Sequence, residues 1–205
     1  MRIVAAIIAG GQSSRMSGRE KALLDFGGKP LLLHVIERIR PQVDAIVINA
    51  NGDPRRFSQF GLRVVADESA DVTTPLAGLH AALRFAAANG FDAVLSVPSD
   101  TPFLPDDLAA RLGEAKVPAI AASGGRSHYL TGLWPVTLAG HLDQEMKEGL
   151  RRVQDFAASC GARVVEWPAL PVDPFANINT PQEMQDALRV VTVQHGASRK
   201  SASLD

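Results

Sequence analysis

Short runs of apolar residues rich in valine and isoleucine alternate along this chain with longer amphipathic stretches. The apolar runs occupy residues 3–8, 45–48, 62–65, 93–97, 117–121 and 162–166. Uninterrupted apolar runs of this length are typical of strands that are covered on both faces. Each run therefore predicts a buried strand, and the stretches between the runs are left to form the covering layers.

Helical patterns fill several of these stretches, and each pattern begins near a proline. Residues 31–39 carry apolar side chains at three- and four-residue spacing after Pro30, and we expect further helices over residues 76–88, 106–113 and 182–190. Asp106 and Asp107 should occupy the first turn of the third helix, and Thr180 can cap the fourth. Strand and helix in alternation predict a three-layer α/β/α domain with a mostly parallel sheet.

Composition narrows the possible partners of this domain. The chain has 205 residues and a net charge of −1, which gives no general attraction to nucleic acid or to an anionic membrane. It has no apolar stretch of 18 residues, and Cys160 is its single cysteine, so no intrachain disulfide can form. We expect a soluble cytoplasmic protein with a single domain over residues 1–191 and a polar, disordered tail over residues 192–205.

The loop after the first apolar run contains the most informative residues. Small residues, Ala9, Gly10 and Gly11, let backbone N–H groups approach phosphate oxygens, and the basic residues Arg15 and Lys21 follow. The loop matches neither the G-x-G-x-x-G fingerprint nor the P-loop pattern. From composition alone, a glycine-rich surface turn flanked by solvated charges is as good an interpretation as a phosphate-binding loop.

The motif Ala-Gly-Gly-x-Ser-x-Arg-Met-x-Gly-x-x-Lys, residues 9–21, resembles the signature of the molybdenum cofactor guanylyltransferases. These enzymes are nucleotidyltransferases with a Rossmann-like GT-A fold. The likeness continues in the family's order through Gly-Lys-Pro-Leu at 28–31, Asn-Ala-Asn at 49–51, Pro-Leu-Ala-Gly at 75–78, Pro-Ser-Asp-Thr-Pro at 98–102 and Asn-Ile-Asn-Thr-Pro at 177–181. It covers residues 2–190.

The resemblance implies a reaction and its participants. It implies that GMP passes from GTP to the terminal phosphate of molybdopterin, with or without bound molybdenum, and that pyrophosphate is released. It also implies Mg²⁺ as the cofactor, nucleotide binding by the N-terminal half, acceptor binding by the C-terminal half, and transient contact with molybdoenzyme chaperones or other cofactor biosynthesis proteins. It implies no nucleic-acid partner.

The resemblance also assigns roles to individual residues. The catalytic residues it implies are Arg15, Lys21 and Asp100. The nucleotide-binding residues it implies are Ile8, Ala9, Gly10, Gly11, Lys21, Asn49, Asp67, Gly78 and Asp100. The acceptor-binding residues it implies are His128, Arg151, Arg152, Asn177 and Asn179. If Arg151 and Arg152 lie on a helix, their side chains point about 100° apart and only one faces the site.

Asp100 is the candidate metal ligand. It follows the apolar run at 93–97 and so should lie at the carboxyl end of a strand, where ligands of open α/β sheets gather. Mg²⁺ prefers one or two carboxylates together with substrate phosphates and water. Without the resemblance, a turn residue would be the better interpretation of Asp100, and the same holds for Asn49 and Asp67; for His128 a structural role is about as good.

Three departures from the family pattern affect the predicted contacts. Thr74 replaces a glycine and could narrow the base pocket, Glu20 replaces an aspartate, and Tyr129 replaces a proline beside His128. The alternatives are a nucleotidyltransferase of the same fold that uses CTP or acts on a sugar or alditol phosphate, and a nucleotide-binding protein without catalysis. The presence of Lys21 and Asp100 disfavours the last of these.

Overall fold

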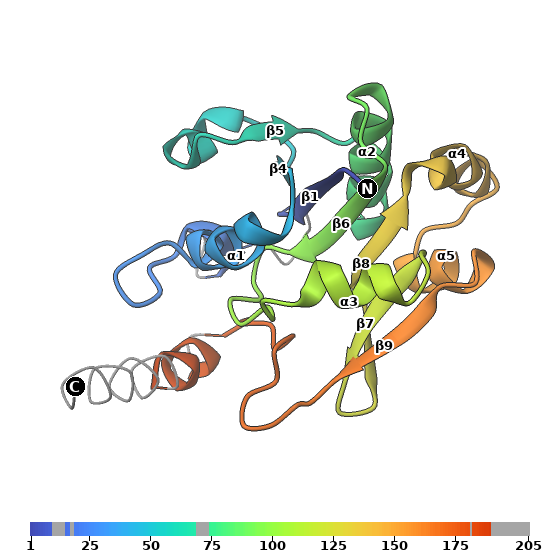
Figure 1. The fold of residues 1–205 in the computed structure, drawn as a ribbon. Coiled ribbons are helices and arrows are strands. Elements are labelled where there is room, and N and C mark those ends of the chain that lie inside the picture. The colour runs from blue at the N-terminus through green and yellow to red at the C-terminus, as the bar shows by residue number, and fades with distance from the viewer. Residues whose placement is uncertain (10–14, 17–18, 69–73, 181, 190–205) are drawn as a thin grey trace.

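The computed structural model describes residues 1–9, 15–16, 19–68, 74–180 and 182–189 (Figure 1). Its main sheet has seven strands. Their spatial order is β5 (Arg63–Val65), β4 (Ala45–Asn49), β1 (Ile3–Ile8), β6 (Ala93–Pro98), β8 (Arg126–Pro135), β7 (Ala119–Ser123) and β9 (Arg163–Trp167). The tail predicted for residues 192–205 lies outside the described residues.

Most neighbouring strands in this sheet are parallel, as predicted. The strands β5, β4, β1 and β6 pair in parallel, and β9 is parallel to β7. The exception is β8, which is antiparallel to both β6 and β7 and was not predicted. A separate two-stranded antiparallel ribbon consists of β2 (Arg15–Met16) and β3 (Arg19–Glu20).

Helices cover both faces of the sheet, which confirms the three-layer prediction (Figure 1). Along the fully buried strand β1, Ala5 and Ile7 belong to the core under α1 (Leu31–Ile39) and α3 (Leu108–Glu114), whereas Val4 and Ala6 belong to the core on the other face. That second core lies under α2 (Pro75–Ala88), α4 (Ala139–Lys147) and α5 (Val153–Ser159). Successive side chains of a strand point to opposite faces, so a continuous apolar run is what two covered faces require.

The predicted helices are present, with corrections at their ends. Residues 182–189 are helical, and the hydroxyl of Thr180 accepts the Glu183 N–H at 3.1 Å, which confirms the predicted cap. The third helix begins at Leu108, so Asp106 and Asp107 precede its first turn. Asp107 instead accepts the indole N–H of Trp167 at 2.9 Å. Neither α4 nor α5 was predicted.

Short 3₁₀ helices complete the described structure: η1 (Lys21–Leu23), η2 (Arg40–Gln42), η3 (Pro54–Phe60) and η4 (Val136–Leu138). No helix in the described part of the chain is long and apolar enough to cross a membrane.

A tight hairpin explains how β8 enters the sheet. Ser123 at the end of β7 pairs with Arg126 at the start of β8, and Gly124 and Gly125 between them have φ angles of 56° and 76°. Two-residue hairpin turns favour glycine because positive φ angles suit the twist of the flanking strands. The hairpin places the first residues of β8 beside the carboxyl end of β7.

Candidate active site

Lys21, Asp100 and Asn179 meet at the carboxyl edge of the sheet. The Lys21 Nζ atom lies 2.5 Å from Asp100 Oδ2 and donates a hydrogen bond to Asn179 Oδ1 at 2.6 Å. The Lys21 side chain is only 6% exposed and that of Asp100 14%. Lysine is rarely buried to this extent unless its charge is paired. Lys21 and Asn179 are 158 positions apart in the sequence, so their contact depends on the fold.

Strands β1 and β6 place Asp100 at this edge. They are parallel neighbours with Ile8 opposite Pro98, and the Ser99 N–H donates to the Ile8 carbonyl at 3.2 Å. The carbonyl of Asp100 accepts the Ile178 N–H at 3.0 Å, which joins the 177–181 motif to the same loop. Asp100 therefore lies at the end of a strand, as its sequence position predicts.

The donor set around Asp100 fits a divalent cation that also binds phosphate. Asp100 Oδ2 pairs with Lys21, and no described residue forms a hydrogen bond or ion pair with Oδ1. The described ranges contain no group of three or more histidine, cysteine, aspartate or glutamate residues that could hold a metal ion by themselves. A single carboxylate suits Mg²⁺, which takes one or two carboxylates and completes its shell with substrate phosphates and water.

A second polar cluster lies at the ends of β4 and β5. Asn49, the last residue of β4, is 1% exposed, and its amide N–H donates to Asp67 Oδ1 at 2.9 Å and to the Val65 carbonyl at 3.1 Å. Asn51 donates to Asp67 Oδ2 at 2.8 Å and accepts the Asp67 N–H at 2.9 Å. Asn49 and Asp67 were predicted as nucleotide ligands. No role was predicted for Asn51, although it is the last residue of the Asn-Ala-Asn motif at residues 49–51, which was the available signal.

Gly78 is required by the position of Asn49. A Cβ atom added to Gly78 would lie 2.2 Å from Asn49 Oδ1, far inside van der Waals contact. The absence of a side chain lets the first turn of α2 approach the end of β4. Thr74, which departs from the family pattern, precedes this turn, and its hydroxyl accepts the Ala77 N–H at 3.3 Å. Its side chain therefore caps α2.

Glu20 and Arg56 connect the two clusters. The Arg56 Nε atom lies 2.8 Å from Glu20 Oε2, and Arg56 Nη2 donates to the Asn51 carbonyl at 2.5 Å. Glu20 directly precedes Lys21, so this ion pair ties the Lys21 segment to the Asn51 loop. The glutamate that replaces the family's aspartate thus has a definite partner.

Only part of the predicted phosphate loop can be placed. The Ala9 N–H donates to the Asn49 carbonyl at 2.9 Å, so it is used within the protein. Gly10, Gly11 and the side chain of Arg15 lie outside the described residues. Their predicted contacts with phosphate stay predictions.

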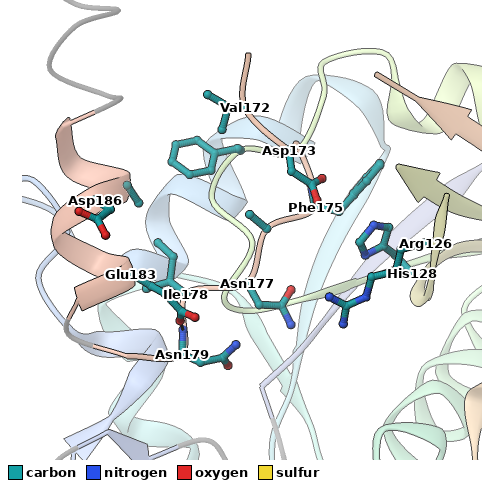
Figure 2. A pocket seen from close by; sticks show the side chains of 13 residues that line it. Arg126, His128, Val172, Asp173, Phe175, Asn177, Ile178, Asn179, Glu183 and Asp186 are labelled. Atoms are coloured by element: carbon teal, nitrogen blue, oxygen red, sulfur yellow. Dashed lines mark hydrogen bonds between the residues drawn. The ribbon is translucent and has the colours of Figure 1, made fainter. Parts of the chain in front are cut away.

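A cavity of about 510 Å³ lies next to Asn179 (Figure 2). Three predicted acceptor ligands, His128, Asn177 and Asn179, are among its lining residues. Arg126 and Asp173 also line it and were not predicted. The Gly-Gly pair at 124–125 was the signal that could have revealed β8 and, with it, Arg126.

His128 is held by a buried serine. The hydroxyl oxygen of Ser123 lies 2.7 Å from His128 Nε2 and 2.7 Å from Asp173 Oδ1, and the imidazole packs against Phe175 with 4.9 Å between ring centroids. Burial lowers the pKa of His128 below its ordinary value, and this effect exceeds the opposing influence of Asp173. The imidazole is therefore neutral at neutral pH.

Arg151 and Arg152 are not among the residues that line the cavity. Both lie in the loop between α4 and α5, with Arg152 at the N-cap position of α5, so the divergence expected of adjacent helical residues does not apply to them. Arg151 Nη1 donates to the carbonyls of Met146 and Leu150 at 2.8 and 2.7 Å, which stabilises the end of α4. A guanidinium used in this way was not foreseeable from the motif.

Comparisons with known proteins identify the family of this chain. Residues 5–164 match the family model of the MobA-like NTP transferase domain. A molybdenum cofactor guanylyltransferase of Rhodopseudomonas palustris (strain BisB5) is 44% identical over 194 residues, which cover 91% of this chain and 92% of that protein. Another from Acidiphilium cryptum (strain JF-5) is 47% identical over 184 residues, covering 89% and 92%.

A solved structure confirms the fold. The molybdopterin-guanine dinucleotide biosynthesis protein A from Archaeoglobus fulgidus matches with a TM-score of 0.68 and 22% identity over 92% of this chain and 98% of that one. The resemblance to molybdenum cofactor guanylyltransferases and the expected GT-A-like fold are thereby confirmed. The family model spans most of the chain and the relatives match it nearly end to end, so this protein belongs to the MobA-like NTP transferase family of nucleotidyltransferases.

Proposed function

We propose that this protein transfers GMP from GTP to the terminal phosphate of molybdopterin, forming the guanine dinucleotide of the cofactor and releasing pyrophosphate. The observation that carries the proposal is the contact of Lys21 with Asp100 and Asn179. This contact lies between the cluster around Asp67, which suits a base, and the cavity, which suits an acceptor. The names of the relatives support the identity of both substrates.

The cluster around Asp67 has the hydrogen-bonding groups that guanine needs. Guanine offers N1–H and N2–H₂ as donors, and a carboxylate is the side chain that accepts both at once. Each Asp67 oxygen accepts one amide N–H from Asn49 or Asn51 and retains a lone pair for a ligand. Both asparagines thereby orient the carboxylate before any nucleotide arrives.

The Lys21–Asp100 pair has the charges that transfer of a nucleotidyl group requires. A phosphate oxygen of the acceptor attacks the α-phosphorus of GTP, and the bond to the bridging α–β oxygen breaks, so that negative charge accumulates on the departing pyrophosphate. Lys21 can neutralise that charge, and catalysis of such transfers depends on positioning and charge neutralisation. Asp100 would hold Mg²⁺, which when bound supplies further neutralisation of the phosphates.

The cavity has a suitable size for the acceptor. Its volume of about 510 Å³ lies within the range typical of small-molecule sites, roughly 300–1,000 Å³. Asn179 both lines this cavity and contacts Lys21, so an acceptor bound there has a path for its phosphate to the reacting centre. Location in the cytoplasm and transient contact with molybdoenzyme chaperones or other cofactor biosynthesis proteins stay predictions.

The direct test is to incubate the protein with GTP, Mg²⁺ and molybdopterin and to score the guanine dinucleotide by mass spectrometry and pyrophosphate by a coupled assay. We expect both products in equal amounts, and little product when CTP or ATP replaces GTP. Faster product formation with CTP than with GTP would show that the nucleotide substrate is CTP. Release of pyrophosphate without a dinucleotide product would show that molybdopterin is not the acceptor.

A further inference from the structure

The hydrogen bonds of Ser123 determine which nitrogen of His128 carries a proton. Ser123 is 2% exposed, and its hydroxyl lies between His128 Nε2 and Asp173 Oδ1, at 2.7 Å from each. A hydroxyl has one proton to donate, and an ionised carboxylate can only accept. The serine must therefore donate to Asp173, and its lone pair must accept from His128, so that Nε2 bears the hydrogen.

Other contacts fix the carboxylate and the imidazole in this arrangement. Asp173 Oδ1 also accepts the backbone N–H of Phe175 at 2.9 Å. The ring of Phe175 packs against the imidazole, and its other neighbour is Trp167, at 5.4 Å between centroids and nearly perpendicular. Figure 2 shows Asp173, Phe175 and His128 at one end of the cavity, away from Glu183 and Asp186.

The second ring nitrogen, Nδ1, is consequently a hydrogen-bond acceptor. Burial lowers the pKa of His128 below its ordinary value against the opposing influence of Asp173 and Glu166, and Arg126 acts in the same direction as burial, so the ring is neutral at neutral pH. A neutral imidazole with hydrogen on Nε2 has a lone pair on Nδ1. No described residue forms a hydrogen bond with that atom.

We propose that Asp173 and Ser123 are positioning residues that hold His128 with hydrogen on Nε2, so that Nδ1 accepts a hydrogen bond from the heterocycle of the acceptor substrate. The inference rests on the proposed function for the identity of that substrate. A pterin ring system carries ring N–H and exocyclic amino donors, which match an acceptor atom on His128, a residue that lines the cavity. Such a contact discriminates strongly between ligands, because a ligand without the donor would cover Nδ1 and leave this acceptor without a hydrogen bond.

The first experiment needs no substrate. In protein with ¹⁵N-labelled histidine, NMR at pH 7.5 should show His128 as the neutral form with hydrogen on Nε2. Ser123→Ala should abolish this preference, whereas Asp173→Asn, which keeps an oxygen to accept from the serine, should largely retain it. His141, an exposed residue on α4, serves as the control and should not change in either variant. A wild-type signal with hydrogen on Nδ1 would overturn the proposal.

The second experiment measures recognition. We expect His128→Ala and Ser123→Ala to raise the KM for molybdopterin about tenfold, as the loss of one hydrogen bond does, with kcat and the KM for GTP little changed. In the wild type, the KM for molybdopterin should rise as the pH falls below the pKa of His128, because protonation turns Nδ1 into a donor. The matched control, His141→Ala, should behave as the wild type.

Two results separate this inference from the proposed function. An unchanged KM for molybdopterin in both variants, with an active wild type, would refute the inference alone. If the wild type forms no dinucleotide while NMR shows hydrogen on Nε2, the proposed function and the role of Nδ1 in acceptor recognition both fail, and the tautomer assignment stands.

Discussion

The two ends of the site differ in how their polar side chains are satisfied. At the nucleotide end, Asn49 and Asn51 both donate hydrogen bonds to Asp67, and Gly78 packs closely against Asn49. At the acceptor end, the Arg126 guanidinium makes no ion pair with any residue in the described ranges, and it lines an open cavity. A mutation in the cluster around Asp67 therefore changes the protein's own structure, whereas a mutation of Arg126 should change mainly the binding of a ligand.

This difference has a topological origin. The described residues of the nucleotide end lie at or just after the carboxyl ends of the parallel strands β4 and β5, which are neighbours at one edge of the sheet. The acceptor end combines the antiparallel strand β8 with a segment near residues 172–179 that has no regular structure. Lys21, Asp100 and Asn179 join the two ends.

Lys21→Ala and Asp100→Ala should have the largest effect, because each removes a charge from the transferring phosphates. We expect turnover to fall about 10²- to 10³-fold, as when a preorganised electrostatic contact is removed. Initial rates of pyrophosphate release would measure the loss, and circular dichroism would verify the fold. Lys29→Ala is the matched control, because Lys29 is half exposed and pairs only with Glu37 in the described structure. Near-normal turnover in either variant would exclude that residue from the mechanism.

Gly78→Ala should show how closely the nucleotide end is packed. The added methyl group would collide with Asn49, and overpacking of this kind costs about 1–3 kcal/mol. A lower Tm and loss of the stabilisation that GTP confers are the expected results of a thermal shift assay. Gly140→Ala in α4 is the control, since a Cβ atom there meets nothing within 4 Å. If Gly78→Ala and Gly140→Ala have the same Tm and the same stabilisation by GTP, the nucleotide end is not closely packed and the contrast with the acceptor end fails.

Asp67→Ala should affect selectivity more than rate. Without the carboxylate, guanine loses its acceptor, and the ratio of kcat/KM for GTP to that for ATP should fall about tenfold, in line with one lost charged hydrogen bond. The rate with saturating GTP should change less. Unchanged selectivity would show that the base is recognised elsewhere.

Arg126→Ala should have the smallest effect and should be confined to the acceptor. Because Arg126 is exposed and unpaired in the described structure, its loss should leave the Tm and the KM for GTP unchanged and raise the KM for molybdopterin severalfold, on the order of 1 kcal/mol. Arg163→Ala, at an exposed position on β9 that does not line the cavity, provides the comparison. A fall in Tm with Arg126→Ala would contradict the contrast between the two ends.

The sequence predicted the nucleotide end better than the acceptor end, for a physical reason. Continuous apolar runs predicted parallel strands, so the positions of Asn49, Asp67 and Asp100 at strand ends followed directly and are confirmed. The burial predicted for these strands holds for β4 and β6, whereas β5 at the edge of the sheet is only partly buried. The strand β8 mixes polar and apolar residues, because its first half extends to the cavity and only its second half is buried.

Other features depend on contacts between distant segments. Asn179 was predicted to bind the acceptor, yet its contact with Lys21 follows only from the folded arrangement of segments far apart in the chain. The hydrogen bonds of Arg151 to the end of α4 depend on a loop geometry that its sequence neighbours do not determine.

Trp167 gives the acceptor cavity a built-in optical reporter. Its indole packs edge-on against Phe175, which lines the cavity, and lies under the guanidinium of Arg111. The other tryptophan, Trp134, is fully buried in the core on the opposite face of the sheet, where it stacks on Phe156. Occupation of the cavity should therefore alter the emission of one indole and leave the other constant, so that fluorescence can follow acceptor binding without a label.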